Sequence, residues 1–242
     1  MRSRHLSLTV SLIIVLGLAQ ACCAQQLTPS KSLPLKTQIA PSQDRLHLLP
    51  ILAIGGVLTA VAWPNDRSVQ KEAHDSPLLD IGGSDVGDIY GSGYSLLALS
   101  AGTWGIGQIT GDAYTRQTAR LMFEGLAIDG ALVFGAKHLA GRTRPDGSDR
   151  LSFPSGHTSG AFTFATILSR RYGWRLGAVG YTLATMTAGA RLEDNRHYLS
   201  DVIAGATIGI VVGRWVTRNQ THNAHLPHLV VNSRGVGLAL SF

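Results

Sequence analysis

Two histidines stand in settings that could support acid–base or nucleophilic chemistry. His157 lies in the stretch PSGHTSG (residues 154–160), directly before an apolar segment, and His197 is followed four residues later by Asp201. An imidazole exchanges protons near neutral pH, and its neutral form carries a nucleophilic lone pair. The sequence therefore offers two candidate catalytic groups, and their surroundings must decide between catalysis and a structural role.

Positively charged side chains come shortly before the first histidine. Lys137 ends an apolar segment, and Arg144 follows seven residues later with Pro145 behind it. An ammonium is a point charge and a guanidinium is a planar fork, so the pair suits the oxygens of a phosphoryl group. Cations after a helix also complement the helix dipole without binding a ligand. Taken alone, the cluster leaves both interpretations open.

The residues just before His157 predict the start of a helix. Ser155 is a favourable N-cap residue, and the amides of Gly156 and His157 would then be free donors at a helix N-terminus. Such a terminus is a natural anion site. A capping role alone accounts for Ser155, but it does not account for the cations upstream.

The second histidine has partners at a defined spacing, Arg191-x5-His197-x3-Asp201. If a helix begins near His197, the histidine and the aspartate share one face. Asp201 can then accept a hydrogen bond from one ring nitrogen, which fixes the tautomer and leaves the other nitrogen as the nucleophile. Structural roles also use this His–Asp spacing, and Arg191 could instead pair with Glu193 or Asp194.

Together, the three stretches resemble the signature of the type 2 phosphatidic acid phosphatase superfamily, which includes acid phosphatases, lipid phosphatases and vanadium haloperoxidases. The motifs are Lys137-x6-Arg144-Pro145, Pro154-Ser155-Gly156-His157 and Arg191-x5-His197-x3-Asp201. They span residues 137–201, within a helical layout over about 92–217 that is similar to the helix bundle of this family. Ala190 is a departure, because many members have a serine there, and its absence removes one hydrogen bond to phosphate.

The resemblance implies a phosphatase that uses a phosphohistidine intermediate. It implies that His197 attacks phosphorus while Asp201 orients the ring, and that His157 protonates the leaving oxygen and then activates water. The groups implied to bind the phosphoryl oxygens are Lys137, Arg144, Ser155, the Gly156 amide and Arg191. No metal ion or other cofactor is implied, because the cations provide the electrostatic stabilisation.

Other functions fit parts of the sequence. A vanadate-dependent haloperoxidase would use the same site, with vanadate bonded to His197, although such members tend to have a longer gap between the lysine and the Arg-Pro pair. A non-enzymatic envelope protein would suit the apolar helices but leaves the three motifs unexplained. The sequence also leaves the substrate open. It could be a lipid phosphate, in which case the protein could be an integral-membrane lipid phosphatase, or a small soluble phosphoester.

The elements that must position these residues are predicted to be helices. Six apolar segments predict an all-α bundle of about six core helices, and their frequent Gly and Ala permit close helix packing. The segments are Leu48–Trp63, Ser92–Ile109, Ala119–Lys137, His157 to about Gly173, Trp174–Gly189 and Leu199–Val216. The polar stretch from Pro64 to about Gly91 predicts a loop with at most one short helical piece.

Composition favours burial or membrane contact. Hydrophobic residues make up 45% of the 242 residues and charged residues only 15%. Glu124 and Asp129 lie inside the third segment and the fourth is short for a span, so we expect a compact helical domain in the exported space, either free or associated with a membrane, with an integral bundle as the alternative. The net charge of +6 favours phosphate esters or anionic lipid headgroups as partners, whereas no motif indicates nucleic acid. The oligomeric state is not indicated.

The N-terminus has the layout of a secretory signal peptide, with a basic start, the apolar run Leu6–Leu18 and small residues after it. Cleavage after Ala21 or Ala24 fits this layout, and an uncleaved anchor helix is the alternative. We therefore predict a signal peptide (1–24), a flexible linker (25–46), a phosphatase domain (47–218) and export to the periplasm or cell envelope.

The remaining residues, 219–242, form a predicted tail. Two alternating runs around Asn232-Ser233-Arg234-Gly235 predict a short β-hairpin. His222, His225 and His228 are evenly spaced before it and could bind a transition metal, although a solvated linker is the simpler interpretation.

Overall fold

The computed structural model describes residues 45–77, 83–218, 228–232 and 235–239, and its main body is all-helical. The predicted signal peptide and most of the predicted linker lie outside the described residues, and their boundaries stay predictions. The predicted all-α class is confirmed by the helices that fill residues 83–218.

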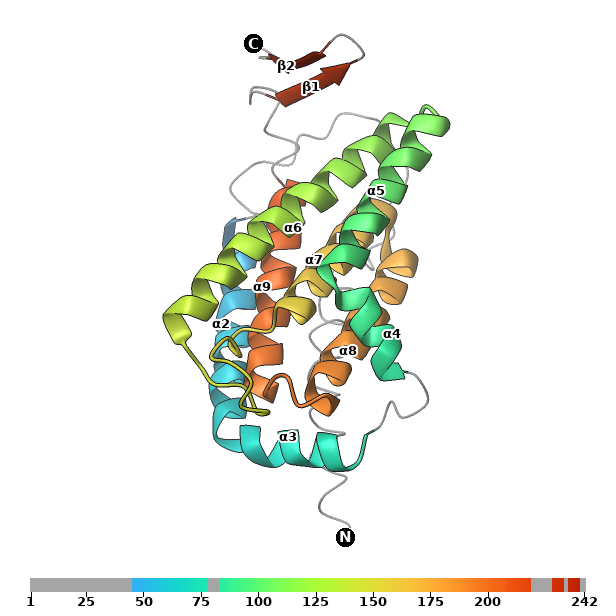
Figure 1. The fold of residues 1–242 in the computed structure, drawn as a ribbon. Helices are drawn as coiled ribbons and strands as arrows, with labels where there is room; N and C mark the ends of the chain where they lie inside the picture. Colours follow the sequence, from blue (N-terminus) through green and yellow to red (C-terminus); the bar gives the residue numbers. More distant parts are fainter. Residues whose placement is uncertain (1–44, 78–82, 219–227, 233–234, 240–242) are drawn as a thin grey trace.

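Each of the six apolar segments forms a helix (Figure 1). Their bounds are α2 Arg45–Ala62, α5 Gly93–Ile109, α6 Ala113–Ala140, α7 Gly156–Tyr172, α8 Trp174–Glu193 and α9 Leu199–Arg218. The third helix is longer than predicted at both ends. Asp112 caps its start by accepting hydrogen bonds from the amides of Tyr114 and Thr115 at 3.0 and 3.2 Å, so the helix begins before the apolar run.

The polar stretch after α2 is more ordered than predicted. It contains a short 3-10 helix, η1 (Trp63–Asn65), followed by α3 (Asp66–Asp75) and, after a gap in the described residues, α4 (Gly83–Gly91). The prediction of a loop was wrong because it relied on the many Asp and Gly residues in this stretch, which are more common in loops than in helices. On α3, the buried residues Asp66, Val69 and Ala73 recur at helical spacing and form a face that packs against α8 and α9.

Helix α7 is the centre of the bundle and packs against α6, α8 and α9. Most of its residues are buried, including Phe162 and Ile167 at 0% exposure. The contact with α9 is especially close, because a Cβ atom on Gly205 or Gly209 would lie only 2.5 or 2.3 Å from a backbone oxygen of α7 or its N-cap. Small residues therefore set the distance between the helix that carries His157 and the helix that carries Asp201.

Three connections meet at one end of the bundle (Figure 1, lower end). They are the loop from α6 to α7, the loop from α8 to α9, and α3, which runs across this end. All three sequence motifs fall in or beside the two loops, so the fold brings together residues that are up to 64 positions apart, from Lys137 to Asp201.

Many large apolar side chains on the outside of the helices are exposed. On α2 they include Leu49, Ile54, Val57 and Val61, which are 53–64% exposed, and similar residues lie on α5, α6 and α8. By length and composition, two stretches could cross a membrane, Leu48–Asp75 and Leu199–Arg218. The second is 78% buried inside the bundle, as a core helix would also be. The outer surface fits membrane association.

In the tail, β1 (His228–Asn232) and β2 (Gly235–Ala239) pair antiparallel, with His228 opposite Ala239. The central turn residues and the chain that joins the strands to α9 lie outside the described residues. The predicted hairpin therefore stays a prediction and is not counted as part of the fold.

Candidate active site

The backbone of two loops is tied together at the site. Gly141 ends α6 with a left-handed φ of 53°, which turns the chain into the loop that carries Arg144. Farther along, the amide of Ser152 donates to the carbonyl of Arg142 at 2.9 Å, and the amide of Ser155 donates to the carbonyl of Asp201 at 3.0 Å. The loop before α7 is thereby fixed to the first turn of α9.

His197 lies between the carboxylate of Asp201 and the guanidinium of Arg144. Its Nδ1 is 3.8 Å from Oδ2 of Asp201, and its Nε2 is 3.5 Å from Nη1 of Arg144. The aspartate favours the proton on Nδ1, and the arginine, which can only donate, favours a lone pair on Nε2. His197 is 2% exposed, and its Nε2 faces the arginine.

Burial lowers the pKa of His197 to about 4, and the nearby charges of Lys137 and Arg144 act in the same direction. The Asp201 carboxylate opposes this shift but does not overcome it. The imidazole is therefore neutral at physiological pH, which is the state that a nucleophile requires.

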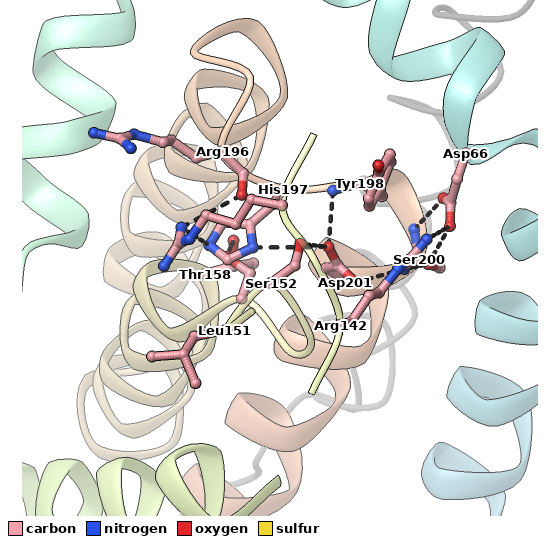
Figure 2. Close-up of polar contacts among 12 residues, drawn as sticks. Asp66, Arg142, Leu151, Ser152, Thr158, Arg196, His197, Tyr198, Ser200 and Asp201 are labelled. Atoms are coloured by element: carbon pink, nitrogen blue, oxygen red, sulfur yellow. Dashed lines mark hydrogen bonds and ion pairs between the residues drawn. The ribbon is translucent and has the colours of Figure 1, made fainter. Parts of the chain in front are cut away.

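Asp201 is fully buried and its two oxygens have separate partners (Figure 2). Oδ1 accepts a hydrogen bond from Nη1 of Arg142 at 2.6 Å. Oδ2 accepts from the amide of Tyr198 at 2.9 Å and from the hydroxyl of Ser152, and it is the oxygen that faces His197. The carboxylate cannot rotate without breaking several of these bonds.

Lys137, Gly156 and His157 form the other side of the site. Lys137 lies in the last turn of α6, and its ammonium donates to the carbonyl of Leu151. A Cβ atom on Gly156 would lie 3.8 Å from Cε of Lys137, so the lysine stem passes close to the start of α7. His157, the second residue of α7, is partly exposed.

Arg144 is anchored on its far side by Asp149. Its Nε donates to Oδ1 of Asp149 at 2.8 Å, while Nη1 lies 3.4 Å from the carbonyl of Arg196 and also faces His197. The hydrogen bond from Arg144 lowers the pKa of the Asp149 carboxyl. This ion pair aims the guanidinium at the space in front of the histidine.

Ser155 occupies the predicted N-cap position, but its hydroxyl does not cap the helix amides. It is fully buried and its Oγ is 2.9 Å from the hydroxyl oxygen of Thr158. The helix still begins here because the Ser155 carbonyl accepts from the amide of Ser159 at 3.0 Å.

Arg191 is placed differently from the other predicted phosphate ligands. Its side chain is paired with Asp194, at 2.5 Å, and with Asp88 of α4. Its carbonyl accepts from the amides of Arg196 and His197, both at 3.1 Å, and so shapes the loop that presents the histidine. The sequence left open whether Arg191 pairs with Asp194, and this ion pair is present. A role for Arg191 in binding phosphate stays a prediction.

The sequence alone did not single out several residues that hold the site. These are Asp66, Asp149, Arg142, Ser152 and Tyr198. The sequence did contain an indication for Arg142, because it is a second arginine two residues before Arg144 in the same motif loop. It contained none for Asp66, which lies in the stretch that was predicted to be a loop.

A cavity of about 520 Å³ lies directly beside His157. Its wall comes from α5, α6 and α7 and is largely apolar, with the carboxyl of Asp129 as its one acidic group among the described residues. The rim includes Leu97 and Phe123, which are 45% and 38% exposed, so the cavity reaches the outer surface between α5 and α6. His157 therefore borders a largely apolar cavity that is open to the side of the bundle.

Among the described residues, no group of three or more His, Cys, Asp or Glu side chains is arranged to hold a metal ion. His222 and His225 lie outside the described residues, so the choice between a solvated linker, which the sequence favours, and a metal site is not tested there.

Residues 118–224 match the family model of the PAP2 superfamily. A curated relative, lipid A 1-phosphatase of Porphyromonas gingivalis, is 43% identical over 99 residues, which cover 38% of this chain and 22% of the relative. The chain therefore aligns with less than a quarter of the length of this relative.

Two solved structures are similar in fold. LpxE of Aquifex aeolicus has a TM-score of 0.54 and 25% identity, covering 63% of this chain and 94% of that one. A transmembrane PAP2-type phosphatidylglycerolphosphate phosphatase of Bacillus subtilis has a TM-score of 0.60 and 20% identity, covering 72% and 96%. The second likeness bears on the fold alone.

Proposed function

We propose that this protein is a metal-independent phosphatase of the PAP2 superfamily, whose family model residues 118–224 match, and that it hydrolyses a phosphate monoester of a lipid through a phosphohistidine. The observation that carries the proposal is the placement of His197, with Nδ1 toward Asp201 and Nε2 toward Arg144. A phosphoryl group bound by the arginine would present its phosphorus to this nitrogen.

The proposed reaction has two halves. Nε2 of His197 forms a bond to phosphorus as the bond to the leaving oxygen breaks, and His157 gives that oxygen its proton. His157 then takes a proton from a water molecule, which attacks the phosphohistidine and releases inorganic phosphate. Lys137, Arg144 and the amide at the start of α7 stabilise the charge on the phosphoryl oxygens in both halves.

A lipid alcohol as leaving group is supported by two features. The apolar cavity borders His157, the residue that we propose protonates the leaving oxygen. The cavity also opens between helices whose outer faces carry exposed apolar side chains, so an acyl chain could enter from a bilayer. The P. gingivalis relative is named for a phosphorylated lipid, which supports the same substrate class. We therefore favour the integral-membrane alternative for the location of the bundle.

The substrate class can be tested by filling the cavity. Gly130 lines it, and a Cβ atom there would have no neighbour within 4 Å, so the side chain in Gly130→Leu can start into the cavity without meeting the surrounding helices. Each methylene that the chain can no longer bury costs about 0.8 kcal/mol, so losing two or three gives about a 10- to 50-fold loss in kcat/KM. We expect this loss for a long-chain phosphatidate and less than about a twofold change for p-nitrophenyl phosphate.

Gly135→Leu is the matched control, because Gly135 lies on the same helix, away from the cavity, and also has open space around it. It should leave both substrates unaffected. Equal losses on the two substrates in the Gly130 variant, or none on either, would argue against a lipid alcohol in this cavity.

A further inference from the structure

We propose that Arg142, held by Asp66 of α3, is a positioning residue that fixes Asp201 in the orientation needed to hold His197. The inference rests on the proposed role of His197 as nucleophile. It assigns a function to the corner between α2 and α3, which lies outside residues 118–224, the part that matches the family model.

The guanidinium of Arg142 bridges two buried carboxylates (Figure 2). Nη1 donates to Oδ1 of Asp201 at 2.6 Å and to the hydroxyl of Ser200 at 2.7 Å, while Nη2 donates to Oδ2 of Asp66 at 2.7 Å. The two carboxyl side chains are 0% and 3% exposed. Two buried carboxylates this close need a shared cation, because otherwise one of them would take up a proton.

Asp66 also holds the first turn of α9 directly. Its Oδ1 accepts a hydrogen bond from the amide of Ser200 at 2.8 Å, and its Oδ2 accepts from the Ser200 hydroxyl at 2.5 Å. Asp66 therefore fixes both the arginine and the residue next to Asp201.

Two aromatic rings lie against the guanidinium of Arg142. The Cζ atom of Arg142 is 3.9 Å from the centroid of Trp63 and 4.2 Å from that of Tyr198. Stacking between two rings suits a planar guanidinium and not a lysine ammonium. Trp63 comes from η1 and Tyr198 from the loop after α8, so the arginine joins the N-terminal corner to the loop that carries His197.

The consequence falls on the oxygen that faces the histidine. With Oδ1 occupied by Arg142, the other oxygen of Asp201 is directed at Nδ1 of His197. An aspartate that is rotated or protonated could not hold the Nδ1–H tautomer, and the nucleophilic lone pair on Nε2 would be lost for part of the time. In Ser–His–Asp triads, where an aspartate also sets the tautomer of a catalytic histidine, loss of the correct tautomer is among the most costly defects.

The first test is Arg142→Gln, assayed on phosphatidate in detergent micelles. We expect kcat to fall on the order of 10- to 100-fold while KM changes less than about twofold, since Arg142 does not touch the substrate. Arg150→Gln is the matched control, because Arg150 lies in the same loop, is exposed and binds only the carbonyl of Gly141 among the described contacts. A loss below about threefold in the Arg142 variant would overturn the proposal.

The second test separates positioning from folding. In Arg142→Ala, the space between Trp63 and Tyr198 should accept methylguanidinium, and millimolar amounts should restore kcat at least fivefold, whereas methylammonium should not. Failure of rescue, or equal rescue by methylammonium, would overturn the assignment. Asp66→Asn should lower kcat about 3- to 10-fold, and the double variant Asp66→Asn/Arg142→Gln should lose less than the product of the two single losses, the remainder coming from the direct bonds between Asp66 and Ser200. Additive losses in the double variant would contradict the bridge.

The third measurement does not depend on activity. In ¹⁵N-histidine spectra we expect the Nδ1–H tautomer of His197 in the unmodified protein and in Arg150→Gln, and a mixture of tautomers in Arg142→Gln. An unchanged tautomer would overturn the positioning role. If the unmodified protein hydrolyses no phosphate ester, the proposed function fails, and these spectra still decide the role of Arg142.

Discussion

The two ring nitrogens of His197 face groups of opposite charge, although the buried Nδ1 has no hydrogen-bond partner among the described residues and is 3.8 Å from Asp201. Asp201 on the Nδ1 side sets the tautomer, and Arg144 on the Nε2 side marks where a phosphoryl group would bind. The surrounding protein keeps the ring neutral because burial disfavours its charged form. At the scale of single residues, the neutral ring and its two charged neighbours suit the nucleophilic role that we propose for His197.

The titration of His197 follows from this environment. Its folded pKa of about 4 lies below the usual 6.5, so the ring stays neutral until the pH falls toward 4. Because the unfolded chain binds the proton more readily, stability due to this group is present above pH 6.5 and is lost as the pH falls from 6.5 to 4. In ¹⁵N-histidine spectra, assigned by comparison with His197→Gln, the ring should titrate near pH 4. A midpoint near 6.5 would contradict the burial account.

A second prediction at the residue scale concerns Ser152. Its hydroxyl donates to the oxygen of Asp201 that faces the histidine. Ser152→Ala should lower kcat about 3- to 10-fold, because the carboxylate keeps its other partners. Ser148→Ala, in an exposed part of the same loop, should stay within about twofold. A Ser152 variant as active as the unmodified protein would mean that this hydroxyl does not help to orient Asp201.

At the scale of elements, the contact between α7 and α9 sets the geometry of the site. Gly209 lets α9 approach the backbone of α7, and a Cβ atom there would lie 2.3 Å from the carbonyl oxygen of Ser159. Gly209→Ala should therefore destabilise the bundle by about 1–3 kcal/mol, measured as a lowered Tm in detergent. The close approach is required because His157 and Asp201 lie in the first turns of these two helices.

Gly105→Ala is the control for this contact. Gly105 lies in α5, where an added Cβ atom would have no neighbour within 4 Å. The substitution should be neutral or stabilising by about 0.5–1 kcal/mol, because alanine favours helix over glycine. If the two variants had the same Tm, the close packing of α7 and α9 would not limit stability.

The sequence predicted the six apolar helices well, because each is a long apolar segment with clear ends. It missed α3, whose buried face consists of Asp66, Val69 and Ala73 and gives little apolar signal. The motif spacing identified His157, His197 and Asp201 as candidates but not Arg142, because a partner of Asp201 that comes from another loop is visible only after folding. The sequence could not show where the side chain of Arg191 lies, because it pairs with Asp88 of α4, a helix that the sequence did not predict.

At the scale of the whole molecule, the site lies at one end of a bundle with an apolar outer surface. Val57 and Val61 on α2 are 61% and 62% exposed, and they lie on the stretch that is long and apolar enough to span a membrane. Such side chains are stable in contact with lipid and costly in contact with water. The bundle is therefore expected to be embedded in a bilayer, with the loops that carry the site at one membrane surface.

Extraction tests this placement. The protein should remain in the membrane pellet after washing with alkaline carbonate and should be released only by detergent. Release by carbonate alone would indicate a peripheral protein and would favour small soluble phosphoesters as substrates.

The most direct test of the central claim is the capture of the covalent intermediate. The protein is mixed with ³²P-labelled phosphatidate and quenched with alkali within milliseconds, because phosphohistidine is stable to alkali and labile to acid. We expect label on the peptide that contains His197 and no label in His197→Asn. The variant His157→Asn should accumulate label if the substitution slows the attack of water more than it slows the formation of the phosphohistidine. Label elsewhere in the chain, or turnover by His197→Asn at a rate near that of the unmodified protein, would contradict the account.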